Sequence, residues 1–234
     1  MKKVCFDYGH GGRDPGAVYK GRMEKDDVLK VGRMVANMLR EEGVQVDETR
    51  ITDISLSLKA RSDIERAGKY DFFVSFHRNA FKSEKARGVE TFIYLNPTRK
   101  AKDLAGEIQK GLESLGFRNR GVKRANFYVL RETRAPALLV ELGFIDNSMD
   151  NRLFDKNLGR ISSEISAAIL GALGLEGKSQ SYKDLKKTGK EEGSGKETYY
   201  RVVAGSFKSR DNARKRIEEL RQAGFQSIIM VYEK

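Results

Sequence analysis

The feature that most constrains the fold is a short apolar run that stops abruptly at three polar residues. The run Phe72-Phe-Val-Ser-Phe76 is followed at once by His77, Arg78 and Asn79. A run of this length is typical of a buried strand in a sheet that is covered on both faces. In open α/β sheets, the edge formed by the carboxyl ends of such strands is where ligands bind. We therefore expect His77 at a functional edge of a sheet.

The first 175 residues alternate between expected strands and helices. The apolar runs predict strands over 3–8, 44–49, 72–77, 88–95, 127–130 and 137–145, and the last of these is apolar on both sides and therefore central. Apolar residues at helical spacing predict helices from Glu24 to residue 43 and over 56–67, 101–115 and 153–173. This alternation predicts an α/β domain of three layers, with helices flanking a twisted, mostly parallel central sheet.

The composition changes after residue 175. Residues 176–198 contain almost no large apolar side chain, which predicts a flexible linker. Residues 199–234 follow a strand–helix–strand pattern, a small βαβ unit with its helix starting near Asp211. Such a short segment cannot bury an independent core. We therefore expect this half-module to dock on the first domain or to pair with a second copy, which would make the chain a homodimer.

Two histidines and one glutamate are candidate metal ligands. His10 and His77 are the only histidines in the chain, and each ends an expected strand, while Glu24 begins an expected helix. Two imidazoles and a carboxylate can bind zinc and leave a fourth position open. Each histidine is equally compatible with an ordinary core or surface position. Glu24 is also compatible with a carboxylate that the helix dipole favours at a helix N-terminus.

Glu141 interrupts the apolar run Leu138-Leu-Val-Glu-Leu142. A carboxylate in a buried strand is costly unless it is paired or protonated. Burial raises the pKa of such a group towards neutrality, which suits a general acid/base. The alternative is a structural ion pair between Glu141 and one of the many arginines.

Charge and composition narrow the classes of protein and of partner. The formal charge of +12 favours an acidic partner. Its long-range electrostatic field would attract either nucleic acid or a cell wall rich in carboxylates and phosphates. No nucleic-acid-binding motif is present, tryptophan is absent, and the basic residues are scattered. No apolar run is long enough for a membrane span. Cys5, the single cysteine, excludes an internal disulfide and is expected to be a buried, inert thiol.

The sequence contains seven blocks, in this order: Asp7-Tyr-Gly-His-Gly-Gly-Arg-Asp-Pro-Gly-Ala17, Gly21-Arg-Met-Glu24, Thr49-Arg50, Ser75-Phe-His-Arg-Asn-Ala80, Gly88-Val-Glu-Thr-Phe92, Asn119-Arg-Gly-Val122 and Pro136-Ala-Leu-Leu-Val-Glu-Leu-Gly-Phe-Ile-Asp-Asn147. Together these blocks resemble the zinc-dependent N-acetylmuramoyl-L-alanine amidases of the type 3 group. The resemblance implies that His10, Glu24 and His77 bind Zn²⁺ and that Glu141 is the catalytic acid/base. It also implies the substrate, the amide between N-acetylmuramic acid and L-alanine in peptidoglycan. Arg78 and Asn79 are candidate substrate-binding residues, with Arg78 either meeting a stem-peptide carboxylate or forming a surface salt bridge.

The tail contains Tyr200-Arg-Val-Val-Ala-Gly-Ser-Phe207, followed by an expected helix. These segments are similar to the SPOR repeat, a module that binds glycan in the septal wall. Because a whole module has a βαββαβ layout, this tail corresponds to about half of one. The N-terminus runs straight into the candidate site and lacks the apolar core of a signal peptide. We therefore expect synthesis in the cytoplasm and action on the cell wall after release or lysis, as an endolysin or an autolysin.

Three other functions stay open at this point. The chain could be a catalytically silent peptidoglycan-binding protein on the same fold, although it retains all three ligand candidates and Glu141. It could be another zinc hydrolase of the wall, a peptidase or a deacetylase. A nucleic-acid binder is favoured only by the charge.

Overall fold

The computed structural model describes residues 1–175, 207 and 209–222. The chain divides into two compact units, Met1–Gly189 and Lys190–Lys234, and each is described by itself. In the second unit the expected helix is present as α7 (Arg210–Gln222). The expected linker over 176–198 and the two expected tail strands, apart from Phe207, lie outside the described residues.

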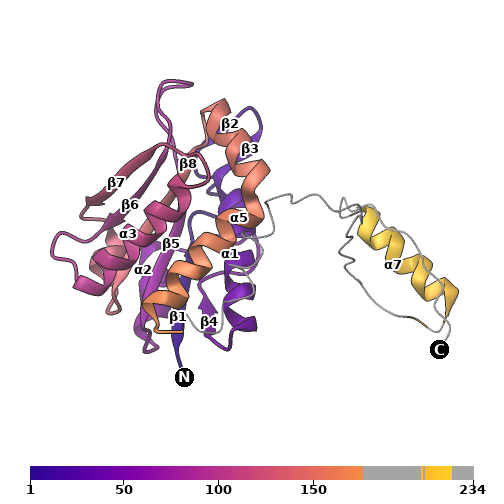
Figure 1. The fold of residues 1–234 in the computed structure, drawn as a ribbon, viewed down its shortest axis with the longest axis horizontal. Helices are drawn as coiled ribbons and strands as arrows, with labels where there is room; N and C mark the ends of the chain where they lie inside the picture. Colours follow the sequence, from indigo (N-terminus) through magenta and orange to yellow (C-terminus); the bar gives the residue numbers. More distant parts are fainter. Residues whose placement is uncertain (176–206, 208, 223–234) are drawn as a thin grey trace, which may run out of the picture. The chain divides into compact units, whose positions relative to one another are not determined.

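The first unit is built on a six-stranded sheet with the strand order β4-β1-β5-β8-β6-β7 (Figure 1). All neighbouring strands are parallel except β6 and β8, which are antiparallel. The mostly parallel sheet expected from the sequence is therefore confirmed, with 137–145 at its centre. The strands are β1 (Lys3–Tyr8), β4 (Gln45–Glu48), β5 (Phe72–Asn79), β6 (Val89–Ile93), β7 (Asn119–Arg124) and β8 (Ala137–Phe144). A separate hairpin pairs β2 (Val18–Tyr19) with β3 (Arg22–Met23).

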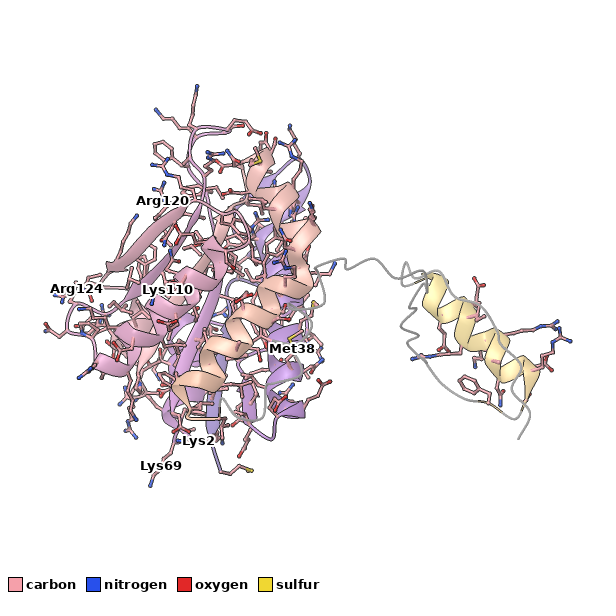
Figure 2. All side chains as sticks on the ribbon, in the orientation of Figure 1. Lys2, Met38, Lys69, Lys110, Arg120 and Arg124 are labelled. Carbon is pink, nitrogen blue, oxygen red and sulfur yellow. The ribbon has the colours of Figure 1, made fainter. Side chains whose placement is uncertain are left out.

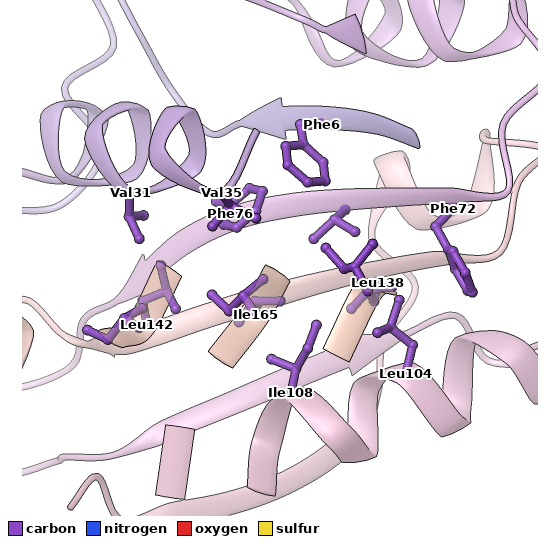
Figure 3. Packing of buried hydrophobic residues seen from close by; sticks show 14 of the residues in the cluster. Phe6, Val31, Val35, Phe72, Phe76, Leu104, Ile108, Leu138, Leu142 and Ile165 are labelled. Atoms are coloured by element: carbon purple, nitrogen blue, oxygen red, sulfur yellow. The ribbon is translucent and has the colours of Figure 1, made fainter. Parts of the chain in front are cut away.

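Three long helices pack against one face of the sheet. They are α1 (Glu24–Glu41), α3 (Arg99–Glu113) and α5 (Ser148–Ala172). Figure 3 shows how Val31 of α1, Ile108 of α3 and Ile165 of α5 meet apolar side chains such as Phe76 and Leu138 of the strands. Burying each large apolar side chain contributes about 1.5–3 kcal/mol. This main core therefore holds the sheet rigid behind the site.

Two shorter helices, α2 (Leu58–Arg66) and α4 (Tyr128–Arg131), belong to the opposite face. The smaller core on this face includes Phe73 of β5 and Leu139 of β8. Side chains alternate along a strand, so the next residues on this face are Ser75 and His77 in β5 and Glu141 in β8. The apolar face thus gives way to polar side chains toward the carboxyl ends of these strands.

One expected strand is wrong, and three strands were not expected, namely β7 and the two strands of the β2–β3 hairpin. Residues 127–130 do not form a strand, since Tyr128–Arg131 is the short helix α4, with Val129 and Leu130 buried in the smaller core. A four-residue apolar run fits a strand and a helical turn equally well. The strand lies earlier, in the polar segment Asn119–Arg124, where an edge position removes the apolar alternation that would reveal it.

The surface of the first unit carries basic side chains in separate places. Lys2, Lys69 and Lys110 are all exposed; Lys2 and Lys69 lie near one another at the lower end of the view in Figure 2, whereas Lys110 lies higher. None of the described helices combines the length and the apolar character needed to cross a membrane.

Replacing Asn147 by alanine should lower the free energy of unfolding of the first unit by about 1 kcal/mol. The side-chain oxygen of Asn147 accepts hydrogen bonds from the amides of Met149 (3.0 Å) and Asp150 (3.1 Å) at the start of α5. Alanine leaves both amides without that acceptor. Urea unfolding curves measure the loss, with Ser163→Ala within α5 as the control. Equal stabilities of the two variants would contradict this capping role.

Candidate metal centre and active site

The structure brings together the three candidate ligands, which are far apart in sequence. His10 follows β1, Glu24 is the first residue of α1, and His77 lies near the end of β5. One ligand atom from each lies within 4.8 Å of the other two. The Glu24 carboxylate bridges the imidazoles, with 3.1 Å between Oε2 and His10 Nε2 and 2.9 Å between Oε1 and His77 Nδ1. The three groups thus face one point, as a metal site requires.

The turn that carries His10 is held in an uncommon backbone conformation. His10 has a φ of +60°, in the left-handed region. A Cβ atom on the preceding Gly9 would lie 2.3 Å from the His77 ring, so only glycine allows the two histidines to approach. Arg61 donates to the carbonyls of Tyr8 (2.6 Å) and His10 (2.7 Å), on either side of Gly9. A buried arginine therefore fixes the strained turn, a role that the sequence analysis did not identify.

Arg61 is itself held by a buried carboxylate. Its Nη1 lies 2.7 Å from Asp7 Oδ1, and Asp7 also accepts hydrogen bonds from Thr49 (2.8 Å) and Ser75 (2.7 Å). Burial alone would raise the pKa of Asp7, but the charge and hydrogen bond of Arg61 hold that pKa below its ordinary value. The ionised pair links β1, β5 and α2 beneath the site.

Glu24 is oriented by the protein rather than by solvent. It is 4% exposed, and its two oxygens accept hydrogen bonds from the amides of Ala17 and Arg78, both at 3.0 Å. Burial alone would raise the pKa of Glu24, but the hydrogen bonds with His10 and His77 lower that pKa below its ordinary value. The carboxylate at this helix start therefore points between the two imidazoles and carries a negative charge.

The electrostatic field at this point favours a cation. Burial alone would lower the pKa of His10, but the hydrogen bond and charge of Glu24, helped by Asp14, raise that pKa to about 9. A field that stabilises a proton on an imidazole also stabilises a divalent cation bound by the same nitrogens.

Asp14 is a partner of His10 that the sequence analysis did not single out. Asp14 Oδ2 lies 2.8 Å from His10 Nδ1, while its Oδ1 accepts a hydrogen bond from the amide of Gly16 (3.0 Å). A metal-binding histidine commonly donates its second ring N–H to a carboxylate, which sets the tautomer and the ring orientation. The available signal was an aspartate four residues after the histidine, within a glycine-rich turn.

Glu141 lies beside His77 on the neighbouring parallel strand, where the two residues are register partners. Its Oε2 is buried and has no hydrogen-bond partner among the described residues. Burial raises the pKa of Glu141 to about 7, against the opposing charge of His77. Within the described residues Glu141 forms no ion pair with an arginine, which leaves this carboxylate available for proton transfer.

The two candidate substrate-binding residues have different surroundings. The Arg78 side chain is 0% exposed, pairs with Asp27 at 2.6 Å and stacks on the Phe154 ring at 4.4 Å. In this conformation it cannot contact a ligand, and its salt bridge is internal rather than on the surface. Asn79 is half-buried and donates from Nδ2 to Glu90 (2.6 Å). Only Asn79 therefore lies on the open side of β5 with His77.

Two family patterns match the chain. The N-acetylmuramoyl-L-alanine amidase pattern matches residues 4–171, and the SPOR domain pattern matches residues 174–230. The second match begins 25 residues before the half-module expected from position 199.

Relatives and solved structures carry the same family name. The sporulation-specific N-acetylmuramoyl-L-alanine amidase of Bacillus subtilis is 36% identical over 235 residues, which is 99% of this chain and 85% of that protein. The crystal structure of an N-acetylmuramoyl-L-alanine amidase from Clostridium difficile is 34% identical, with a TM-score of 0.71 over 74% of this chain and 97% of that one.

A second solved structure with the same family name is also similar to this chain. The catalytic domain of an N-acetylmuramoyl-L-alanine amidase from Paenibacillus polymyxa is 32% identical, with a TM-score of 0.69 over 75% of this chain and 99% of that one. The fold, the family pattern and these relatives lead to one conclusion. The chain belongs to the N-acetylmuramoyl-L-alanine amidase family and carries a SPOR domain after its amidase domain.

Proposed function

We propose that this protein is a zinc-dependent peptidoglycan hydrolase that cleaves the amide between N-acetylmuramic acid and the L-alanine of the stem peptide. Family membership over residues 4–171 supports the reaction class. The observation that carries the proposal is Glu141, whose Oε2 is buried and has no hydrogen-bond partner among the described residues, beside a triad of His10, Glu24 and His77. Hydrolysis of an amide needs a proton acceptor placed next to an electrophilic centre.

The triad fits zinc. It offers two imidazole nitrogens and one carboxylate oxygen, the three-ligand set of catalytic zinc sites that keep one position open. Imidazole ligands favour zinc over magnesium or calcium, which prefer oxygen atoms throughout. The carboxylate of Asp14 on His10 Nδ1 and the backbone amides on Glu24 supply the outer hydrogen bonds that such ligands need. When bound there, zinc acts as a Lewis acid towards a carbonyl oxygen and promotes deprotonation of water.

Glu141 transfers the protons in this scheme. With a pKa raised to about 7 by burial, its carboxylate accepts a proton from the attacking water and then donates it to the leaving amine of L-alanine. A group whose pKa lies near the working pH serves in both directions. Because Oε2 has no partner among the described residues, no internal hydrogen bond must break first.

The products of wall digestion test the reaction. Purified protein with zinc should release new L-alanine amino groups from cell walls, without new reducing sugar ends and without acetate. New amino groups on other residues would indicate a peptidase, and acetate would indicate a deacetylase. Wall binding with no new ends would indicate a silent peptidoglycan-binding protein.

We propose that catalysis and wall binding belong to different domains. We assign catalysis to residues 1–175 and wall binding to the SPOR-like segment 199–234, joined by residues 176–198, and the SPOR pattern over 174–230 supports the second assignment. Pairing of two tails into one module stays a prediction. Light scattering after size-exclusion chromatography, combined with a wall pull-down, tests it, and a monomer with full wall affinity would contradict it.

Replacing Asp14 by alanine should weaken zinc binding by about 10–100-fold. Without that carboxylate, the His10 ring loses the 2.8 Å contact at Nδ1 that sets its tautomer and orientation. Competition with a chromophoric chelator measures the zinc Kd. Asp63→Asn, which removes the same charge from the surface of α2, is the control. Unchanged zinc affinity in Asp14→Ala would exclude a role for Asp14 in orienting His10.

A further inference from the structure

The edge strand β7 contains a bulge beside the site. Val89 and Thr91 of β6 pair with Asn119 and Val122 of β7, so the segment of β7 between the paired positions is one residue longer than that of β6. Gly121 within this segment has a φ of +84°, a conformation that glycine adopts without strain. Bulges of this kind re-aim side chains and are frequent next to active sites.

The bulge directs two cations to one carboxylate. Residues three apart on a regular strand point to opposite faces, yet Arg120 and Lys123 both contact Glu90. Arg120 Nε lies 2.8 Å from Glu90 Oε2, and Lys123 Nζ contacts the same oxygen. The other oxygen, Oε1, accepts the hydrogen bond from Asn79. Two positive groups share one negative group, which leaves a net positive charge on this cluster of three side chains.

This charge lies next to the proposed proton-transfer residue. Glu90 of β6 is the register partner of Glu141 across the antiparallel β6–β8 pair. Strands are about 4.8 Å apart, so β7 runs roughly 10 Å from β8. An extended peptide covers about 3.3–3.6 Å per residue, so a chain leaving Glu141 towards β7 reaches the two cations within about three residues.

Both cations can accept a further anion. The side chains of Arg120 and Lys123 are 27% and 40% exposed, whereas that of Glu90 is 5% exposed. The guanidinium of Arg120 is held over the Phe144 ring at 4.9 Å. Within the described residues no hydrogen bond is formed by Arg120 Nη2, and Lys123 Nζ donates only to Glu90. A single cation would neutralise Glu90, so the second is not explained by Glu90 alone.

We propose that Arg120 and Lys123 form a subsite for a carboxylate of the stem peptide within about three residues of the scissile amide. The proposal rests on the proposed amidase function and names a chemical requirement of its substrate. Arg78 was the earlier candidate for binding a stem-peptide carboxylate, but its buried side chain is already paired with Asp27. Arg120 and Lys123 replace it in that function.

Two matched substrates test the subsite. We would compare synthetic N-acetylmuramoyl tripeptides that end in L-lysine amide and carry either D-glutamate or D-isoglutamine at the second stem position. The two differ only in one carboxylate against one carboxamide, and neither has another carboxylate in its stem. The wild type should show a lower KM for the carboxylate substrate. Lys123→Met should raise that KM about tenfold, the loss of one charge-assisted hydrogen bond, and leave kcat unchanged. The KM for the carboxamide substrate should not move.

Arg124→Met is the control. Arg124 lies on the same strand and is exposed (Figure 2), so this variant loses the same charge without touching Glu90. In Lys123→Met, Arg120 still neutralises Glu90, and a thermal melt checks the fold. An equal KM for the two substrates in the wild type overturns the subsite alone, as does an equal effect of Lys123→Met on both. If Arg124→Met raises the KM for the carboxylate substrate as much as Lys123→Met does, the positive surface attracts the substrate only in a general way. That result also overturns the subsite. A wild type that cleaves neither substrate overturns the amidase function, and the subsite with it.

Discussion

Glu141→Gln should lower kcat by about 10²–10⁴-fold, the usual contribution of a general acid/base, while the protein keeps its zinc. Glutamine has nearly the same shape as glutamate but cannot accept the proton of the attacking water. Glu141 is not among the groups that converge with His10 and His77, so metal binding should not change. Dye release from labelled walls measures turnover, and metal analysis measures the zinc content of the same samples.

Glu107→Gln provides the matched control for this substitution. Glu107 is an exposed carboxylate on α3 paired with Lys110, so the change in charge is the same but lies on the helix-covered side of the sheet. This control should keep wild-type turnover. A Glu141→Gln variant with more than a tenth of the wild-type kcat would overturn the role assigned to Glu141.

His77→Ala should abolish turnover and zinc binding together. The substitution removes one of the three proposed ligand groups and also the ring that lies against Gly9. The zinc Kd should rise by more than the roughly 10–100-fold expected for Asp14→Ala, which removes only a hydrogen-bond partner of a proposed ligand. The ratio of zinc to protein after dialysis is the direct measurement.

Thermal unfolding gives an independent readout of the same variant. A ligand that binds only the folded state raises the Tm, so zinc should stabilise the wild type and Glu141→Gln but not His77→Ala. Comparing the two variants separates loss of the metal from loss of the proton acceptor. A His77→Ala protein that keeps one zinc per chain and its zinc-dependent Tm shift would refute the proposed ligand set.

Sequence patterns located the elements that carry the site. The apolar run that ends at His77 and the one that precedes the glycine-rich turn of His10 predict strands, and the two strands do lie side by side in the sheet. These strands can be predicted because a run of buried side chains is visible directly in the sequence. Glu24 was placed at a helix start, and α1 does begin there. Glu141 was expected to have a raised pKa because a carboxylate inside an apolar strand loses its hydration wherever the strand packs, and burial does raise it.

The partners of these residues were decided only by the tertiary structure. Whether Arg78 faces a ligand or the core depends on Asp27 and on Phe154, which lies 76 residues further along the chain. The bulge that turns Arg120 and Lys123 to one side depends on how β7 pairs with β6. The sequence by itself determined which segments are buried and where polar groups interrupt them, because periodicity is a local property. Only the folded chain determined which charges meet, because an ion pair or hydrogen bond joins residues whose separation along the chain has no bearing on their distance in space.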